Sequence, residues 1–468
     1  MDFLMKNKIN LRSSILLLTV LVAAWLSFFP LDGQSAEFSQ SVAVILLTLV
    51  FWSTGVFPPF LTGLLFFGLA VVLDLIAPNV LFAGFGSTAV WLIVSGFVIG
   101  AAITNSGMGR RLAAFISPYV TQSYAFLIGG LVLSAVSLGF VMPSSVGRAV
   151  VLIPIGMALA DRVGFIHGSN GRLGIATSLA IACNMPSFAV LPANIPNMIL
   201  AGASETLYGI EMGYTEYLWL HFPILGILKS VVLVWVVLRI FPDQIATPIS
   251  SKSDQTGITP AERALQKKTS MLLGITLLFW MTDSWHGINP AWVGLFTAIF
   301  LLLPKWGVVQ PKDFNKSVDF ATVVFVAAAL GLGALVNSSG IGTAMGNEFA
   351  QLLPSSEDSS FLSYMALSVG AALTGLVATI PGVPTVLTPM AGDFAQITGF
   401  SLPVVLMTQV VGFSTIVFPY QVGPLIVAMQ LSGEPLRKLL RITIPLAIIT
   451  VVFLMPLDYL WWRLIGWL

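Results

Sequence analysis

Long runs of apolar residues, separated by short polar stretches, extend along almost the whole chain. Uncharged and mainly apolar runs of about 18 residues or more, such as 84–104 and 124–142, exceed the length that a helix in a soluble core needs. These runs do not alternate between apolar and polar positions, as the roughly 10-residue strands of a membrane β-barrel do. The pattern therefore predicts an all-α polytopic membrane protein.

The first apolar run, from Ser13 to Leu31, follows three basic residues and precedes a Gly-Gln-Ser-Ala-Glu stretch. A signal peptide before its cleavage site has a similar arrangement, but its apolar core is usually only about 7–15 residues long. We therefore interpret residues 1–36 as an uncleaved N-terminal transmembrane helix.

A polar stretch at residues 242–269, rich in Ser, Thr, Pro and charged residues, divides the chain into two similar halves. Because four short segments match between the halves in the same order, we infer an internal duplication. Repeat 1 is predicted at 37–241, a cytoplasmic linker at 242–269 and repeat 2 at 270–468. The matching segments are Phe51 to Thr54 with Phe279 to Thr282, Asn105 to Gly109 with Ser338 to Gly342, the segments closing at Pro154 and Pro389, and those starting at Leu191 and Phe418.

The placement of Lys and Arg predicts the topology. One initial helix, followed in each repeat by five crossings and one re-entrant hairpin, makes about eleven transmembrane helices with a cytoplasmic N-terminus. The basic groups then lie on the cytoplasmic side, except for Arg463 outside and Arg148 and Lys229 within the membrane, in agreement with the positive-inside rule. An odd number of crossings inverts the second repeat, and inverted repeats with interrupted helices are typical of secondary transporters.

Clusters of Pro and Gly interrupt four of the apolar runs, at 143–147, 192–196, 379–384 and 419–424. Broken backbone is not tolerated against lipid, so each interruption is expected to face protein or a water-filled cavity. Each leaves a half-helix whose N-terminal N–H groups are free and carry positive partial charge. Four such ends would attract an anion, although each Pro or Gly by itself also suits a simple kink in a packed helix.

Composition and charge narrow the function further. Hydrophobic residues make up 57% of the chain and charged residues 9%, against about 25% charged in a soluble domain. The net charge of +1 gives no indication of a nucleic-acid partner, and a single cysteine, Cys183, excludes an internal disulfide or a cysteine metal cluster. We find no nucleophile–base set and no nucleotide-binding loop, so we expect a transporter rather than an enzyme.

The motifs at the interruptions resemble those of the divalent anion/sodium symporter family, within the ion transporter superfamily, from Leu47 onward. The first, Pro-Ser-Ser-Val-Gly-Arg, is similar to the Pro-Ser-Asn-Thr-Ala-Arg of citrate/tartrate antiporters and plastid dicarboxylate translocators, and its arginine is Arg148. The resemblance implies a homodimeric, elevator-type carrier of di- or tricarboxylates or inorganic oxyanions. Its implied location is the inner (plasma) membrane, with the lipid bilayer and a small anion as partners and no organic cofactor.

The same resemblance implies the site residues. It places one hairpin tip at Ser144–Val146 and the other at Thr379–Pro381, or at Gly382 and Val383 if a gap intervenes. The implied substrate-binding residues are Ser144, Ser145, Val146, Arg148, Asn194, Pro196, Asn197, Thr379, Pro381, Gly382, Gln421, Gly423 and Pro424. The implied Na⁺ ligands are Ser144, Ser145, Ala193, Thr379 and Gln421.

The departures from the family pattern concern coupling. The tip asparagines of sodium-coupled members are Ser145 and Ile380 here, and the tip threonines are Val146 and Pro381. A hard cation prefers several oxygen ligands, and two amide oxygens are missing. Coupling to Na⁺ is thus left open, with anion exchange or H⁺ coupling without Na⁺ as the alternative.

Arg148 is the only charged residue between Arg111 and Asp161. An arginine within the membrane costs at least about 2.5–3.5 kcal/mol on insertion scales, so it needs a cavity or a partner. That partner is either a bound anion or an internal carboxylate such as Asp161 or Asp393, and snorkelling is a further alternative. Lys229 is expected to be structural or to line a cavity.

Overall fold

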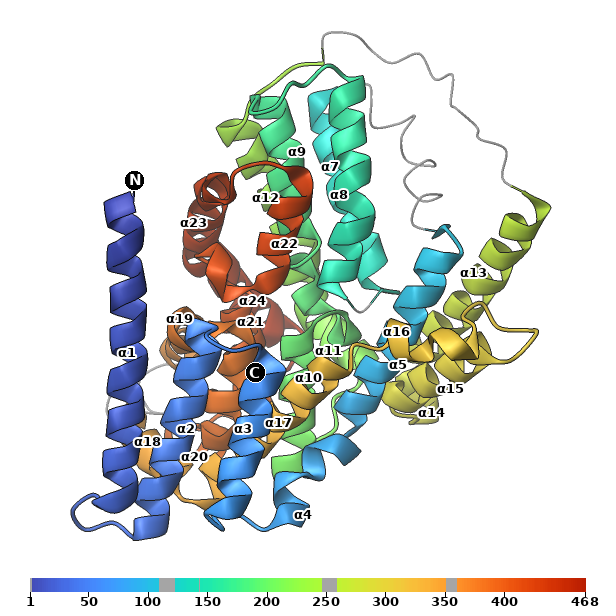
Figure 1. The fold of residues 1–468 in the computed structure, drawn as a ribbon. Helices are drawn as coiled ribbons and strands as arrows, with labels where there is room; N and C mark the ends of the chain where they lie inside the picture. Colours follow the sequence, from blue (N-terminus) through green and yellow to red (C-terminus); the bar gives the residue numbers. More distant parts are fainter. Residues whose placement is uncertain (1, 109–122, 143, 246–258, 351–359) are drawn as a thin grey trace. The chain divides into compact units, whose positions relative to one another are not determined.

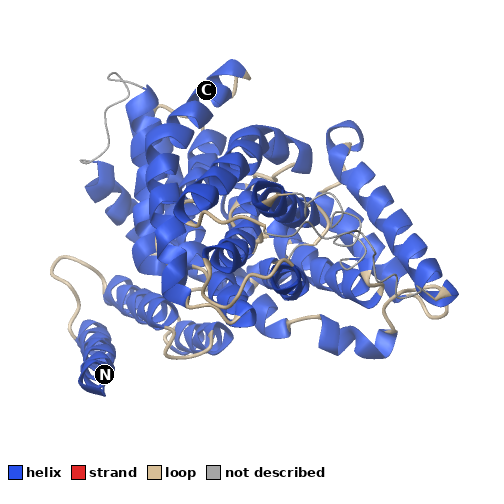
Figure 2. Ribbon diagram, turned by 90° about the horizontal axis from the view of Figure 1, so that it is seen from above, coloured by secondary structure: helices blue, strands red, loops and turns tan. Residues whose placement is uncertain are grey.

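The computed structural model describes residues 2–108, 123–142, 144–245, 259–350 and 360–468. Within these residues the regular elements are helices (Figure 1). The view from above shows helices joined by loops and, in the described part of the chain, no β-strand (Figure 2). The prediction of an all-α protein is confirmed.

Among the residues that the structure describes, six helical spans are long and apolar enough to cross a membrane, and further apolar helices contain 10–17 residues. This agrees with the predicted multi-pass membrane protein, while the count of about eleven crossings with two re-entrant hairpins stays a prediction. The six spans are Ala36–Thr54, Thr88–Asn105, Tyr214–Ile240, Phe320–Ser338, Ser360–Thr398 and Leu436–Leu464.

The chain forms two compact units. The first unit contains Met1–Val90, Ile199–Glu211 and Phe320–Gln409, and the second contains Trp91–Met198, Met212–Asp319 and Val410–Leu468. Each unit draws on both predicted repeats. The boundaries of the two repeats and of the linker between them therefore stay a prediction.

The helices of the first unit are α1 (Asp2–Phe28), α2 (Ala36–Thr54), α3 (Pro59–Val72), α4 (Pro78–Leu81), α17 (Phe320–Ser338), α18 (Ile341–Ala350), α19 (Ser360–Leu387) and α20 (Ala391–Thr398). Those of the second unit are α7 (Tyr124–Gly139), α8 (Ser145–Arg162), α9 (Asn170–Ala182), α11 (Tyr214–His221), α12 (Lys229–Ile240), α13 (Pro260–Met281), α14 (Asp283–His286), α15 (Pro290–Leu302), α16 (Phe314–Ser317), α22 (Gly423–Ser432), α23 (Leu440–Ile449) and α24 (Met455–Leu464). The boundary between the units falls inside α5 (Thr88–Asn105), α10 (Ile195–Tyr208) and α21 (Leu402–Phe413).

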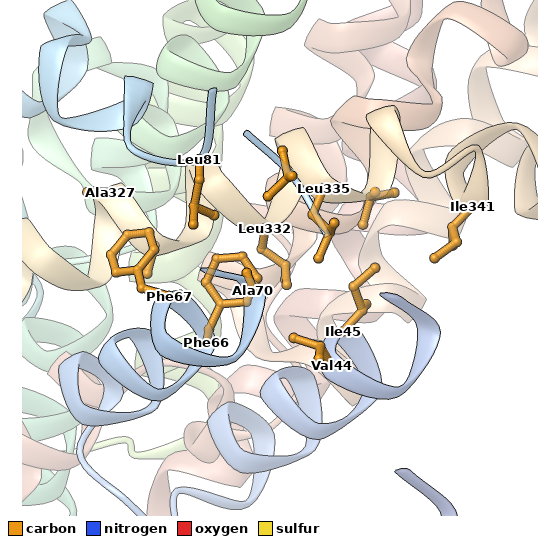
Figure 3. Packing of buried hydrophobic residues seen from close by; sticks show 13 residues of the cluster. Val44, Ile45, Phe66, Phe67, Ala70, Leu81, Ala327, Leu332, Leu335 and Ile341 are labelled. Carbon is orange, nitrogen blue, oxygen red and sulfur yellow. The ribbon is translucent and has the colours of Figure 1, made fainter. Parts of the chain in front are cut away.

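A hydrophobic core in the first unit joins α2, α3 and α17 (Figure 3). Phe66, Ala70 and Leu332 are among its buried members, and burial of each large apolar side chain contributes about 1.5–3 kcal/mol. Gly63 lets α3 approach α17 closely, because a Cβ atom there would lie 2.7 Å from the Cβ atom of Ala328. Such close approach through small residues is typical of helices packed within membranes.

Local sequence explains where several helices begin. Ser35, Ser144 and Ser169 each precede a helix, and each Oγ atom accepts a hydrogen bond from the backbone N–H three residues later. Thr259 and Glu262 form a capping box at the start of α13. These contacts satisfy N–H groups that a helix leaves without partners at its first turn.

Two spans of the second unit contain π-helical turns, which lie in the last helix of each predicted repeat. The turn η4 (Phe222–Leu228) joins α11 to α12, and η9 (Thr450–Leu454) joins α23 to α24. The two turns pack against each other. Such turns often mark functional positions, and Lys229 follows η4 directly.

Candidate functional site

The first predicted tip lies between α7 and α8 in the second unit. Ser144 caps α8, since its Oγ atom accepts a hydrogen bond from Gly147 N at 3.0 Å. Ser145 begins the helix and is buried, whereas Val146 on the same turn is 38% exposed. The chain thus leaves helical geometry where the Pro-Ser-Ser pattern predicts an interruption, and it re-enters it with a positive helix N-terminus.

The Arg148 side chain lies in the first turn of α8 and has no exposed surface. Its guanidinium group has five N–H donors, and the acceptors around it are neutral oxygen atoms from both sides of the tip and from a second helix interruption. Nε donates to Cys183 O (3.0 Å), Nη1 donates to Met142 O and Ala193 O (3.2 Å), and Nη2 donates to Ser145 Oγ (3.0 Å), Cys183 O (2.8 Å), Ser187 Oγ (2.6 Å) and Ala193 O (3.2 Å).

Among the residues that the structure describes, no carboxylate lies within ion-pair distance of Arg148. Asp161 pairs with Arg172 instead, because thirteen residues of α8 place it about 20 Å from Arg148 along the helix axis. An ion pair of Arg148 with Asp161 is therefore wrong, and snorkelling is wrong as well because the side chain is fully buried. A pair with Asp393, which belongs to the other unit, stays a prediction.

The consequence is a positive charge that carbonyl and hydroxyl dipoles hold in place without cancelling it. A unit charge about 4 Å from an anion attracts it by roughly 4 kcal/mol at an effective dielectric constant of 20. Since every N–H group of Arg148 already has an acceptor, this attraction would act through the electric field rather than through a direct hydrogen bond.

Asn194 connects the tip to the interruption between α9 and α10. Its Oδ1 atom accepts a hydrogen bond from Ser145 Oγ, and its Nδ2 atom donates to Asn184 O (3.2 Å) and Ser187 Oγ (2.9 Å). Asn194 and Arg148 therefore share the hydroxyl groups of Ser145 and Ser187 as partners. The tip and the interruption form one hydrogen-bonded structure.

Asn197 fixes the irregular backbone between η2 (Pro186–Ala189) and α10. Its Nδ2 atom donates to Phe188 O (3.1 Å) and Val190 O (2.9 Å). The Oδ1 atoms of Asn184 and Asn197 are buried and have no hydrogen-bond partner among the described residues. Because buried polar atoms are normally paired, these two acceptors are available to a water molecule or to a donor on a ligand.

The second interruption of the second unit lies between α21 and α22. The Gln421 side chain holds it, because Oε1 accepts hydrogen bonds from Val417 N (2.8 Å) and Phe418 N (2.7 Å). Gly423 and Pro424 are the first two residues of α22, which packs against α8 and α9. The half-helix after this interruption thus contacts the helix that carries Arg148.

Lys229 binds the end of α21. Its Nζ atom donates to Ser414 O (2.7 Å) and Ser414 Oγ (3.3 Å), and Ser414 directly follows the last residue of that helix. Lys229 is 1% exposed and interacts electrostatically with Asp458, a fully buried residue of α24. These contacts suit a structural lysine, while the prediction that it is either structural or cavity-lining stays a prediction, and its partner atoms could not be foreseen from the sequence.

The second predicted tip lies in the first unit. The α19 helix is interrupted at Thr379, whose φ of 62° and ψ of 168° are not helical. A residue with a Cβ atom adopts this conformation at a cost of about 1–3 kcal/mol, and such strain is concentrated at functional sites. Pro381 and Gly382 follow directly.

A cavity of the same unit lies against α19, α20 and α21 and is lined by Gly370, Thr374, Phe394 and Gln409, among others, but not by these tip residues.

Direct hydrogen bonds join four of the predicted site residues, which are Ser145, Arg148, Ala193 and Asn194. Adjoining them in the chain are Ser144, Val146, Pro196 and Asn197. The other interruption of the same unit contains Gln421, Gly423 and Pro424, and the other unit contains Thr379, Pro381 and Gly382.

Sequence reasoning missed Ser187 and the carbonyl groups of Met142 and Cys183. Only the proximity of Ser187 to a proline-rich interruption could have indicated it.

Comparison with known proteins identifies the family. Residues 47–412 match the family described as citrate transporter, which is more than half of the chain. The chain belongs to the citrate transporter family. This membership agrees with the resemblance to anion transporters that we inferred from the motifs at the helix interruptions.

Several relatives of this chain are named as antiporters. The L-tartrate/succinate antiporter of Escherichia coli K12 is 23% identical over 399 residues, which cover 81% of this chain and 79% of the antiporter. The citrate/succinate antiporter of the same organism is 24% identical over 263 residues and 53% of each chain. A membrane protein of Cupriavidus necator is 25% identical over 402 residues, or 82% of this chain and 76% of that protein. Family and antiporter relatives support a transporter rather than an enzyme, as predicted.

Two solved structures share the fold over most of the chain. The YdaH transporter of Alcanivorax borkumensis has a TM-score of 0.56 at 16% identity and covers 83% of this chain and 88% of its own. MtrF of Neisseria gonorrhoeae has a TM-score of 0.55 at 13% identity and covers 94% of this chain and 97% of its own. At these identities the likeness concerns the fold alone.

Proposed function

We propose that this chain is a secondary active transporter of small di- or tricarboxylate anions. The family match and the antiporter relatives named for citrate, tartrate and succinate support the carboxylate class. The observation that carries the proposal is the buried Arg148 guanidinium group, whose acceptors among the described residues are neutral. A positive charge of this kind is suited to an anion and unsuited to a neutral or cationic substrate.

The site would bind the anion by combining this charge with helix dipoles. The N-termini of α8 and α22 carry positive partial charge, and α22 packs against α8. Ser145 and Asn194 would shape the site, and Arg148 would position Ser145 by donating to its hydroxyl group. Binding would thus depend on a prearranged positive region rather than on one salt bridge.

The remaining parts of the proposal concern how the carrier moves and where it resides. We infer an elevator-type movement, a homodimer, and an inner-membrane location with the N-terminus in the cytoplasm. The inverted-repeat pattern supports the movement, the resemblance supports the homodimer, and the distribution of Lys and Arg supports the orientation. The hairpins and the two repeats are the elements that such a movement would displace.

Uptake by the purified full chain in proteoliposomes tests the proposal. Radiolabelled citrate, succinate, tartrate and sulfate would be offered separately to vesicles preloaded with the same unlabelled anion, with protein-free vesicles as the control. We expect at least one of the three carboxylates to accumulate and unlabelled sulfate not to compete with it. Transport of sulfate with no carboxylate transported would instead support an inorganic oxyanion carrier and contradict the carboxylate class.

A further inference from the structure

The ends of α12 and α23 bring four side-chain cations together in the second unit. Arg239 lies in the last turn of α12, and Arg441 lies in the first turn of α23. Arg437 and Lys438 belong to the short turn that leads into α23. The guanidinium group of Arg441 lies 5.1 Å from the ring centroid of Phe241, the residue that follows α12. The two helix ends are therefore neighbours, and their cations form one group.

The four cations have no carboxylate partner among the described residues. The acids nearest to them in the chain are engaged elsewhere, because Glu434 pairs with Arg172 and Asp243 accepts hydrogen bonds from two backbone N–H groups. Three of the four cations, all of them arginines, are exposed. Even with Asp243 counted, the group keeps a net positive charge at the surface.

Each of the two helices has an exposed apolar row that leads to this cation group. On α12, Val231 and Trp235 are 59% and 53% exposed and precede Arg239 at intervals of four residues. On α23, Ile444 and Ile448 are 38% and 58% exposed and follow its arginine at intervals of three and four residues. Residues at these intervals are neighbours on the surface of a helix. On each helix, apolar side chains and an arginine therefore share one exposed face.

These faces lie on two candidate membrane spans, Tyr214–Ile240 and Leu436–Leu464. Because α12 packs against α23 and η4 packs against η9, the two spans run in opposite directions with their arginines at the same end. The Cζ atom of Arg239 lies 5.7 Å from the ring centroid of Trp235, and tryptophan is enriched at membrane interfaces. The cations thus suit the level of the lipid head groups, and the apolar rows suit the acyl chains below them.

We infer that the ends of α12 and α23 form a binding site for an anionic phospholipid of the membrane. The lipid phosphate would contact the cation group, and the acyl chains would lie along the two apolar rows. In the proposed orientation this end faces the cytoplasm, and basic clusters on that side of a membrane protein attract anionic head groups. The site would hold a lipid rather than the transported anion, so it goes beyond the proposed function.

Two other occupants fit this surface less well. A second copy of the chain in a symmetric dimer would present the same patch, and the four cations would then face four identical cations. A soluble anion would use the cations but would leave the exposed apolar rows uncovered. A phospholipid matches both the charge of the group and the apolar rows beside it.

Binding of lipid to the purified, delipidated full chain in neutral detergent tests the site. Phosphatidylglycerol and phosphatidylcholine with the same acyl chains would be titrated, and bound lipid would be counted by native mass spectrometry. We expect phosphatidylglycerol to bind the wild type at least about tenfold more tightly than phosphatidylcholine. The double variant Arg239→Gln/Arg441→Gln should raise the Kd for phosphatidylglycerol at least about tenfold, since each cation near an anionic lipid contributes about fivefold.

Lys312→Gln/Lys316→Gln is the matched control, because it removes two exposed cations from another part of the same unit. It should bind phosphatidylglycerol as the wild type does. An equal loss in this control would show general charge attraction and overturn the assigned site. Equal affinity of the wild type for both lipids would overturn the inference, as would an unchanged Kd in the arginine double variant. Competition by glycerol phosphate at concentrations equal to those of the lipid would identify a soluble anion as the ligand instead.

A fluorophore on the apolar row tests the position of the acyl chains in a bilayer. Val231→Cys provides one accessible thiol, because the natural cysteine, Cys183, is buried. In proteoliposomes, phosphatidylglycerol with a spin label on its chain should quench this fluorophore more strongly than labelled phosphatidylcholine at the same mole fraction. The arginine double variant should lose that preference. Equal quenching by both lipids would overturn the site, and a disulfide between Cys residues at position 231 of two copies would assign this face to a dimer.

Discussion

The two helix interruptions of the second unit are both held by a buried cation, but they differ in how much of that charge is compensated. Around Arg148 the described acceptors are carbonyl and hydroxyl oxygen atoms. Around Lys229, the carboxylate of Asp458 adds an opposite charge to the acceptors on Ser414. The first interruption therefore retains a net positive charge, and the second is closer to neutral.

This difference indicates a division of roles. A net charge buried in an apolar region requires a partner. In a transporter of anions, the transported substrate can be that partner while it is bound. The Lys229–Asp458 pair, in contrast, does not require a bound substrate to balance its charge, and it can hold α21 against α12 and α24. We therefore assign anion attraction to the Arg148 region and structural retention, with a supporting charge, to the Lys229 region.

Replacing Arg148 should have the largest effect. Arg148→Gln removes the charge and most of the donors, and we expect exchange of labelled carboxylate in proteoliposomes to fall at least about a hundredfold, in line with about 2–5 kcal/mol for a truncated buried charge contact. Arg148→Lys keeps the charge but loses the planar fork, so it should retain more activity than Arg148→Gln.

Arg162→Gln is the matched control, because Arg162 lies on the same helix, α8, and is exposed. It should exchange at the wild-type rate. Equal activity of the Lys and Gln variants at position 148 would show that geometry, and not charge, is the contribution of this residue.

Asn194→Asp tests the uncompensated charge without removing Arg148. The new carboxylate would be nearly isosteric and would lie beside the hydroxyl groups of Ser145 and Ser187, which also bind Arg148. An internal counter-charge should compete with the substrate, so we expect the Kd for citrate or succinate to rise at least about tenfold at neutral pH. Asn194→Ala is the control, since it removes the amide contacts without adding charge. An affinity for anion equal to that of the control would contradict the proposed compensation.

Lys229 and Asp458 should be energetically coupled. Lys229→Met and Asp458→Leu would each leave the other charge buried without its opposite, and breaking a buried pair costs about 3–5 kcal/mol. The double variant should lose less stability than the sum of the single variants, by about 1–3 kcal/mol. Thermal denaturation of the detergent-solubilised protein and its three variants measures the stabilities in this double-mutant cycle. Additive losses would show that Asp458 does not compensate the lysine.

Gln421→Leu should have the smallest effect of the series. It leaves the N–H groups of Val417 and Phe418 without their acceptor, but Val417 is half-buried and Phe418 is exposed, so we expect a total loss of only about 1 kcal/mol. Gln421→Glu keeps an acceptor at the same place and should be more stable than the Leu variant in the same denaturation assay. The reverse order of stability would mean that these two hydrogen bonds do not hold the second interruption.

Sequence reasoning reached the helical class, the positions of the interruptions and the transporter family, because each depends on local features. Apolar runs predict helices in a membrane, the interruption predicted at 143–147 coincides with the start of α8, and Thr379 marks a second break at the predicted second tip. The motif around Arg148 was enough to indicate the family that the comparison then showed.

The contacts of the buried charges could not be predicted in this way. Arg148 takes its acceptors from positions up to 45 residues away, and backbone carbonyl groups carry no signal in the side-chain pattern. A charged residue in a membrane segment suggests a carboxylate partner, and this expectation led to Asp161 and Asp393. The end of α9 supplied instead an unpaired carbonyl with negative partial charge, and its position depends on tertiary packing.

Equilibrium binding of radiolabelled citrate and succinate to the purified chain tests the central claim most directly, since it separates the charge at the site from the movement of the carrier. Measurements in choline buffer without Na⁺ would compare wild type, Arg148→Lys, Arg148→Gln and the Arg162→Gln control. The account predicts saturable binding by wild type and control, weaker binding by Arg148→Lys, and a Kd raised at least about thirtyfold, corresponding to about 2 kcal/mol, in Arg148→Gln. Wild-type binding that requires Na⁺, or an unchanged Kd in Arg148→Gln, would contradict it.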